Sequence, residues 1–313
     1  MRFVVTGGAG FIGSHLVEHL VGQDHEVVVV DDFSTGRREN IEPWLDRIRL
    51  IEGSIVDRAV CRRACDGADY VLHQAALASV PRSVADPVAT HDANVTGTLN
   101  LLLAAREAGV TRVVYAASSS AYGNTAELPK HEEMVPRPMS PYAVSKLAGE
   151  GYMRAFHCCM GVPTICLRYF NIFGPRQDPA SQYAAVVPRF ITAATSGREQ
   201  VIYGDGEQTR DFTFVANAVH ANMLACQAPR DACGTVYNVG CGSRLSVNEL
   251  WKRIVQLTSS SSTVRYEPAR PGDVRDSLAS LTQTRAALGY EPVVSLDEGL
   301  RTTIQSFASA HVA

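Results

Sequence analysis

The sequence predicts an α/β fold, a doubly wound parallel sheet with a smaller, interleaved α/β unit. Two observations support this prediction. In the first half of the chain, short apolar runs alternate with segments of helical periodicity, and the first run breaks into a glycine-rich turn. This alternation is typical of parallel strands joined by helices, with ligands at the carboxyl ends of the strands. The pattern loosens into loops and short helices afterwards, so we expect a sheet domain over 1–171 and mainly a second domain over 172–313, with a segment near 211–240 returning to the first.

The first strand, expected over residues 3–5, leads into a turn in which Gly7, Gly10 and Gly13 are spaced G-x-x-G-x-x-G. Apolar residues then recur at helical spacing over 14–20. The first glycine permits the tight turn, the second lets a pyrophosphate approach the backbone, and the third lets the helix pack on the strand. Strand, glycine turn and helix in this order predict a dinucleotide site.

The second strand, expected over residues 26–30, ends in Asp31 and Asp32. At this distance from the glycine turn, a carboxylate meets the adenosine ribose. Asp31 favours NAD over NADP because it would repel a 2′-phosphate. Arg37 and Arg38 pull the other way and keep that preference moderate.

Further strands are expected over 48–51, 70–73 and 113–117, with a helix over 94–108 between the last two. The strand at 113–117 delivers three serines, Ser118–Ser120, to the same sheet edge as Gln74–Ala76. Two roles are open for Asn94: a helix cap, or a relay that holds water beside Lys146.

Tyr142 and Lys146 lie four residues apart at the start of a helix that Ser140 and Pro141 introduce. Both side chains therefore share one helical face. An ammonium beside a phenol favours the phenolate, so Tyr142 becomes a candidate base if an oxidised nicotinamide adds a second positive charge. The Tyr-x-x-x-Lys spacing by itself occurs by chance in many helices, and the rest of the chain gives it meaning.

Composition excludes several classes of function. The chain has 313 residues, of which 46% are hydrophobic and 19% charged, and a formal net charge of −3. These values give no reason to expect a nucleic acid or an anionic membrane as a partner. The chain has no apolar run long enough to span a membrane and no cleavable signal before its first strand, so we expect a cytoplasmic protein. Eight scattered cysteines are expected to be buried free thiols, and no metal site is predicted.

Over nearly all of its length, the chain resembles the extended short-chain dehydrogenase/reductases with a Rossmann-type sheet, and within them the nucleotide-sugar 4-epimerases. Beyond the glycine turn, Asp31, the serines and the Tyr142/Lys146 pair, the resemblance includes residues 73–76, 168–171 and 270–274. Residues 76–83, 173–179 and 204–212 look like the bacterial UDP-N-acetylglucosamine 4-epimerases of surface-polysaccharide synthesis.

The resemblance implies a role for each matching residue. Catalysis falls to Tyr142 and Lys146, with Ser118 and Ser119 as the candidates to hold O4 of the sugar and Ser120 as the third. The cofactor would be held by Gly7, Gly10, Phe11, Ile12, Gly13, Asp31, Asp32, Ser34, Thr35, Gly36, Ser54, Ile55, Gln74, Ala75, Ala76, Asn94, Tyr142, Lys146 and Tyr169. The substrate would be held by Ala78, Ser79, Ser119, Ser120, Asn171, Gln177, Val187, Tyr203, Gln208, Arg210, Arg270, Asp273 and Ser277.

Within that set, Arg210 and Arg270 are expected on the diphosphate, because a guanidinium fork forms paired hydrogen bonds with phosphate oxygens. Tyr203 matches the position near uracil. One departure concerns the adenine amine: residues 53–55 read Gly-Ser-Ile where the family usually has an acidic residue, so that contact is weaker or absent.

Ser277 matches the family position at which a bulky residue excludes a 2-acetamido sugar. A serine leaves room, so the expected reaction is NAD-dependent C4 epimerisation of UDP-GlcNAc and UDP-GalNAc, with UDP-Glc and UDP-Gal as further substrates. Alternatives are a UDP-glucuronate 4-epimerase or decarboxylase and, in another class, a non-catalytic NAD-binding regulator. The resemblance also implies a homodimer formed through the helices at 94–108 and 142–158.

Overall fold

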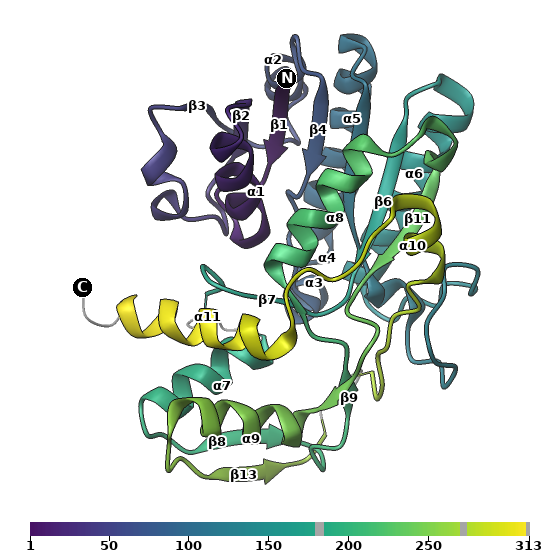
Figure 1. Cartoon of the computed structure of the whole chain (residues 1–313). Coiled ribbons are helices and arrows are strands. Elements are labelled where there is room, and N and C mark those ends of the chain that lie inside the picture. Colours follow the sequence, from purple (N-terminus) through teal and green to yellow (C-terminus); the bar gives the residue numbers. More distant parts are fainter. Residues whose placement is uncertain (179–184, 270–273, 311–313) are drawn as a thin grey trace.

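The computed structural model describes residues 1–178, 185–269 and 274–310 of the chain (Figure 1). A seven-stranded sheet forms one half of the molecule and has the strand order β3-β2-β1-β4-β5-β6-β11. Every neighbouring pair in it is parallel. The predicted doubly wound parallel sheet is therefore confirmed. Its strands are β1 (Arg2–Thr6), β2 (Glu26–Asp31), β3 (Ile48–Glu52), β4 (Tyr70–His73), β5 (Arg112–Ser118), β6 (Thr164–Tyr169) and β11 (Thr235–Val239).

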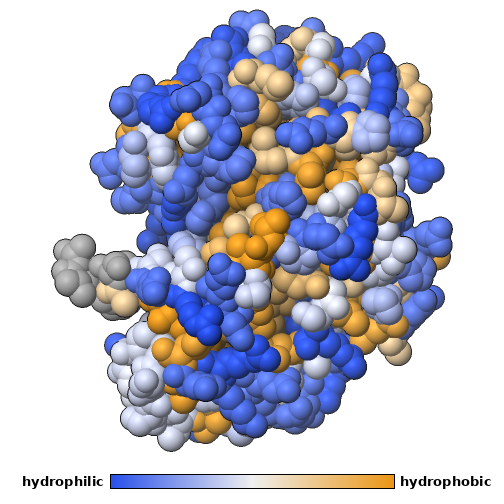
Figure 2. Space-filling view, viewed as in Figure 1, coloured by the Kyte–Doolittle hydropathy of each residue, from blue (hydrophilic) through white to orange (hydrophobic). Residues whose placement is uncertain are grey.

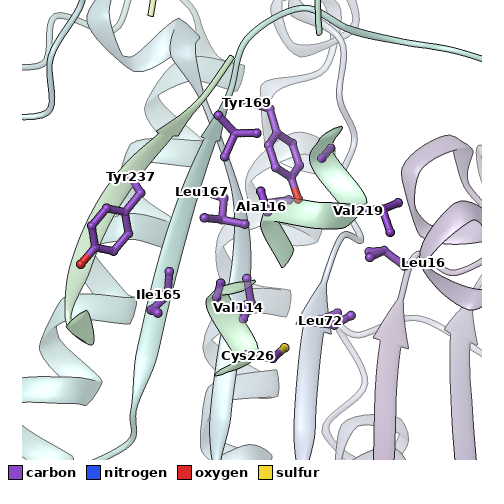
Figure 3. Close-up of a cluster of buried hydrophobic side chains, with 14 of the residues drawn as sticks. Leu16, Leu72, Val114, Ala116, Ile165, Leu167, Tyr169, Val219, Cys226 and Tyr237 are labelled. Carbon is purple, nitrogen blue, oxygen red and sulfur yellow. The ribbon is translucent and has the colours of Figure 1, made fainter. Parts of the chain in front are cut away.

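Helices cover both faces of this sheet, which explains why its strands read as continuous apolar runs. Phe3 and Val5 of β1 pack with α1 and α8 on one face, while Val4 between them packs with α2, α5 and α6 on the other. Figure 3 shows part of the first face, where Leu16 of α1 and Val219 of α8 lie close together, in one cluster with Leu72 and Val114 of the sheet. The helices of this half are α1 (Phe11–Gly22), α2 (Arg58–Cys65), α3 (Val80–Ala85), α4 (Pro87–His91), a π-helical turn (Asp92–Thr96), α5 (Gly97–Ala108), α6 (Pro141–Met160), α8 (Val215–Gln227) and α10 (Thr282–Leu288), with 3-10 helices at Arg38–Asn40, Glu42–Trp44, Ser119–Tyr122 and Arg230–Ala232.

The strand order reverses beside β1, because β2 and β3 follow on one side and β4, β5 and β6 on the other. Crossover connections leave β1 and β4 in opposite directions at this point, so a crevice opens at their carboxyl ends. The glycine turn after β1 and Gln74 after β4 lie at that crevice.

A smaller unit lies below the sheet in Figure 1 and has its own apolar core, which includes Phe190, Trp251 and Leu300. It is built from α7 (Val186–Thr195), α9 (Val247–Thr258), α11 (Leu296–Ala310), a parallel pair of β8 (Gln200–Tyr203) and β13 (Val264–Glu267), a parallel pair of β7 (Ile172–Phe173) and β10 (Thr213–Phe214), and an antiparallel pair of β9 (Thr209–Arg210) and β12 (Leu245–Ser246). The segment predicted to return to the sheet, 211–240, contains α8 and β11. In Figure 2, hydrophobic side chains are visible where the two units meet, and the outer surface of this face is largely hydrophilic.

All eight cysteines are free, as predicted, but not all of them are buried. Cys158 and Cys159 are exposed at the end of α6, and Cys241 is half-buried. The prediction of burial was wrong for these because isolated cysteines carry no periodicity that reports their depth. Among the described helices, none combines the length and the apolar composition needed to cross a membrane.

Candidate active site

The glycine turn after β1 forms a concave stretch of backbone that a side chain at Gly7 or Gly13 would obstruct. Gly7 has a φ of 66°, and a Cβ there would lie 2.7 Å from the backbone nitrogen of Ala75. A Cβ on Gly13 would lie 2.0 Å from the carbonyl oxygen of Gly7. These positions therefore require glycine, and they leave backbone amides at the start of α1 open to a pyrophosphate.

A cleft of about 890 Å³ extends from this cradle along the carboxyl edge of the sheet. Every residue predicted to hold the cofactor lines it, with the exception of Asn94. The volume, the glycine cradle and an acidic residue at the end of β2 fit a dinucleotide.

Asp31 is buried at the end of β2, and its carboxylate also holds the glycine turn in place. One oxygen accepts the N–H of Ala9 at 2.8 Å, and the other accepts the N–H of Phe33 at 2.9 Å. Burial raises the pKa of Asp31, and these two backbone hydrogen bonds oppose that rise. Asp31 thus joins the end of β2 to the pyrophosphate cradle.

Asn94 caps no helix, because it lies inside the π-helical turn Asp92–Thr96. Its amide is used elsewhere, since Oδ1 accepts the N–H of Leu77 at 2.8 Å and Nδ2 donates to the Ser145 hydroxyl at 2.9 Å. Its expected contact with the cofactor stays a prediction, since Asn94 itself does not line the cleft. Asn94 supports the wall of the cleft by binding Leu77, a residue that does line it.

Asn222 of α8 was not found from the sequence, where it is one of several polar residues in a mostly apolar helix. It is fully buried, and its Nδ2 donates to the Tyr169 hydroxyl at 2.6 Å. The same Tyr169 hydroxyl donates to Gln74 Oε1 at 3.3 Å. Asn222 therefore orients two residues that line the cleft.

Tyr142 lies in the first turn of α6, which begins as predicted, with the Ser140 side chain accepting the N–H of Ala143. Its phenol lines the cleft and has a hydrogen bond with the Ser118 hydroxyl. The Ser118 oxygen accepts both the N–H of Ser120 at 3.2 Å and the Ser120 hydroxyl at 2.9 Å. Ser118 is thus linked to both Ser120 and Tyr142.

The effect of Lys146 on the pKa of Tyr142 was predicted for the protein with an oxidised nicotinamide bound, and it stays a prediction. Burial raises the pKa of Tyr142, and only the hydrogen bond from Ser118 opposes this rise. The Lys146 ammonium instead donates to the carbonyl of Ala116 at 2.8 Å and lies 4.9 Å from the centre of the Tyr115 ring. Burial lowers the pKa of Lys146 to about 8, while the nearby Glu150 carboxylate raises it. The shared helical face was predicted correctly, but the direction of the ammonium depends on β5.

A second cavity, of about 280 Å³, lies in the smaller unit and meets the cleft at Ala185, which lines both. The predicted substrate residues Asn171, Val187, Tyr203, Gln208 and Arg210 line this cavity. Arg189 of α7 lines it too, with its guanidinium 5.9 Å from the centre of the Tyr203 ring. The sequence analysis missed Arg189, because its place at this cavity depends on how α7 packs.

The other predicted substrate residues are spread over several places. Ala78, Ser79 and Gln177 line the large cleft, whereas Ser119 and Ser120 follow Ser118 in a 3-10 helix. Ser277 is buried beside β9, where its N–H donates to the carbonyl of Thr209 at 3.1 Å. Arg270 and Asp273 lie outside the described residues.

Comparison with known proteins gives consistent matches. The model of the NAD dependent epimerase/dehydratase family matches residues 3–240. A UDP-glucose 4-epimerase from Mycolicibacterium smegmatis is 39% identical over 311 residues, which cover 98% of each chain. A UDP-N-acetyl-alpha-D-glucosaminuronate decarboxylase from Bacillus cytotoxicus is 34% identical over 317 residues, covering 98% of this chain and 97% of that protein. A solved UDP-N-acetylglucosamine 4-epimerase from Methanobrevibacter ruminantium, in complex with UDP-N-acetylmuramic acid, has a TM-score of 0.94 and 39% identity, covering 99% of this chain and 98% of that one.

Proposed function

The chain belongs to the NAD-dependent epimerase/dehydratase family and is a UDP-sugar 4-epimerase with NAD as its cofactor; we propose that its sugars are N-acetylglucosamine and N-acetylgalactosamine. The proposed reaction inverts C4 of UDP-GlcNAc to give UDP-GalNAc, and the reverse. The observation that supports this chemistry best is the hydrogen-bonded Ser118–Tyr142 pair at the wall of the dinucleotide cleft.

In this proposal, Tyr142 removes the proton of the C4 hydroxyl and returns it after the sugar has turned. Ser118 holds the same sugar oxygen and, by donating to the phenolate, makes it easier to form. Bound NAD supplies a reversible two-electron acceptor for C4 and, when oxidised, a positive charge near the phenol. Lys146, fixed to the Ala116 carbonyl, is placed to bind the nicotinamide ribose.

Inversion requires the nucleotide to be held firmly while the hexose turns. The second cavity suits the nucleotide, since Tyr203 offers an aromatic face and Arg189 and Arg210 offer guanidinium groups for the diphosphate. Most of the binding energy would then act on the part of the substrate that does not react.

The small side chain of Ser277 supports the choice of a 2-acetamido sugar. Ser277 is held next to Thr209, which directly precedes the cavity residue Arg210. The structural relative from Methanobrevibacter ruminantium is named for the same sugar. UDP-Glc and UDP-Gal are proposed as further substrates, because a pocket that admits an acetamido group also admits a hydroxyl.

A second candidate is the decarboxylation or C4 epimerisation of a UDP-uronate. It is favoured by the similarity to the decarboxylase from Bacillus cytotoxicus. The early steps would be the same, because a 4-keto sugar also activates loss of a 5-carboxylate.

We also propose a cytoplasmic homodimer that serves polysaccharide synthesis. Support for the dimer comes from exposed apolar side chains on adjacent helices, namely Val84 of α3, Val88 of α4 and Val144 of α6. Both α3 and α4 pack against α6, so the three helices that carry these residues are neighbours.

The deciding experiment mixes the purified protein with UDP-GlcNAc, UDP-Glc and UDP-GlcA in separate reactions and identifies the products by NMR. The proposal expects UDP-GalNAc from the first reaction. A UDP-pentose or UDP-GalA, formed from UDP-GlcA while the other two sugars are left unchanged, would establish the second candidate instead. No conversion of any of the three would leave the NAD-binding regulator as the better description.

A further inference from the structure

Both arginines that follow β2 are engaged by carboxylates. Nη2 of Arg37 lies 2.7 Å from Oδ2 of Asp178, and Nη2 of Arg38 lies 2.8 Å from Oε2 of Glu52. Arg37 and Asp178 both line the dinucleotide cleft, although they come from opposite halves of the chain. The sequence analysis expected these two arginines to moderate the preference for NAD over NADP. In the structure, a carboxylate is already paired with each of them.

Arg37 belongs to the same local structure as Asp31. The N–H of Arg37 donates to the carbonyl of Ala9 at 3.0 Å, and the N–H of Ala9 donates to the Asp31 carboxylate at 2.8 Å. Ala9 thus links the backbone of Arg37 to the carboxylate that is expected to meet the adenosine ribose. In dinucleotide sites of this kind, an arginine near that carboxylate is what accommodates a 2′-phosphate.

Several contacts hold the segment that carries Asp178 against α1. The carbonyl of Pro175 is 3.0 Å from Nε2 of His15, and Arg176 pairs with Glu18. The guanidinium of Arg176 also lies 5.1 Å from the centre of the Trp44 ring. These contacts anchor Pro175 and Arg176, and the chain that continues from them places Asp178 beside Arg37.

We propose that Asp178 is a specificity-determining residue that excludes NADP by neutralising Arg37 at the ribose end of the cleft. A 2′-phosphate would have to displace the Asp178 carboxylate from Arg37 and also face the negative charges of Asp178 and Asp31. NAD presents a neutral 2′-hydroxyl at the same place and leaves the ion pair intact. This proposal concerns the dinucleotide and is independent of which sugar is converted.

The test removes the charge of Asp178 and measures which dinucleotide the protein holds. Wild type and Asp178→Asn are equilibrated with an equimolar mixture of NAD⁺ and NADP⁺, separated from free nucleotide and denatured, and the released dinucleotides are quantified by mass spectrometry. The bound NADP to NAD ratio should rise roughly tenfold in Asp178→Asn, since the freed guanidinium gains a charge-assisted hydrogen bond to phosphate.

Two controls isolate the role of Arg37. Glu199→Gln breaks a comparably exposed pair with Arg265, outside the cleft, and should leave the ratio unchanged. In Arg37→Ala/Asp178→Asn the ratio should return to that of wild type. An unchanged ratio in Asp178→Asn, or a rise that persists in the double variant, would overturn the proposal. Because neither measurement involves turnover, failure of the proposed sugar chemistry would leave this result interpretable.

Discussion

The Glu150 carboxylate and the Arg168 guanidinium form a buried ion pair with two hydrogen bonds, one helical turn beyond Lys146. Nε of Arg168 donates to Oε1 at 2.8 Å, and Nη2 donates to Oε2 at 2.6 Å. The side chains are 5% and 3% exposed, respectively, so the pair joins α6 to β6 inside the protein. The guanidinium carbon of Arg168 also lies 4.5 Å from the centre of the Tyr122 ring, so the ring packs against the cation.

Glu150→Gln should destabilise the protein by about 3–5 kcal/mol, because it leaves a buried guanidinium without its counter-ion. It should also lower the pKa of Lys146 further, since the Glu150 carboxylate raises it. Urea unfolding measures the first effect, and the pH dependence of turnover measures the second. As a control, Glu291→Gln breaks the exposed pair with Arg285 and should cost under about 1 kcal/mol. Equal costs for the two variants would contradict this account of the buried pair.

Tyr142→Phe should lower kcat by about 10²–10⁴-fold with little change in the Kd of UDP-GlcNAc, because it removes the proposed base and leaves the nucleotide cavity intact. NMR assays of conversion and calorimetric titration measure the two quantities. Tyr266→Phe removes an exposed phenol of β13 and should leave both unchanged. A Tyr142→Phe enzyme with a near-normal rate would rule out Tyr142 as the base.

Ser118→Ala should impair turnover far more than Ser119→Ala, because Ser118 has the hydrogen bond with Tyr142. Loss of that bond raises the pKa of Tyr142 further, so the pH at which turnover is half-maximal should move upward. Full pH–rate profiles of both variants provide the measurement. A larger loss in Ser119→Ala would assign the sugar oxygen to the other serine.

Ser277→Tyr should reduce turnover of UDP-GlcNAc relative to UDP-Glc on the order of tenfold or more, because the ring would occupy the space proposed for the acetamido group. The kcat/KM ratio of the two substrates is the quantity to compare. Ser277→Ala keeps the space and should preserve the ratio. If both substrates declined in parallel in the tyrosine variant, the pocket assignment would be wrong.

His73 should make the protein sensitive to acid. It is fully buried, with ring nitrogens 2.8 Å from the Thr6 hydroxyl and 2.9 Å from the Thr98 hydroxyl. Because Thr98 donates its own hydrogen to the Asn94 carbonyl at 2.6 Å, Nε2 of His73 must be the donor to Thr98, and Nδ1 accepts from Thr6. A neutral ring satisfies this arrangement, and burial lowers the pKa of His73 to about 3.

Between pH 6.5 and about 3, His73 is therefore protonated in the unfolded chain but stays neutral in the folded protein. The contribution of His73 to stability is complete above pH 6.5 and decreases by about 1.4 kcal/mol per pH unit as the pH falls toward 3. Unfolding free energies of wild type and His73→Gln, measured across this range, should converge as the pH falls. A constant difference between the two would refute the assignment.

The sequence predicted those parts of the site whose geometry is local. The Gly7–Gly13 turn could be predicted because steric contact within a single strand–turn–helix unit demands glycine. Tyr142 and Lys146 could be placed on one face of α6 because Ser140 caps its first turn. Strands β1, β2 and β5 were recognisable because burial on both sheet faces makes them continuous apolar runs.

The sequence could not predict which side chains from distant segments would pair with the site residues. The sequence placed Arg37 and Arg38 near the ribose, but not Asp178 and Glu52 against them. The hydrogen bonds of Asn94 with Leu77 and Ser145 could not be predicted, because a single amide carries no pattern that identifies its partners. Arg189 and Asn222 were missed for the same reason, since helix packing alone brings them to the cavity and the cleft.

By itself, then, the sequence determined the sheet, the dinucleotide turn and the identity of the candidate base, because hydrophobic periodicity and glycine sterics act over a few residues. The tertiary structure decided how those groups are charged and held. Only in the folded chain does Lys146 donate to the Ala116 carbonyl, Ser118 bind Tyr142 and Asp178 pair with Arg37. Burial and ion pairing arise only when distant segments meet, and those two effects set the protonation and the selectivity of the site.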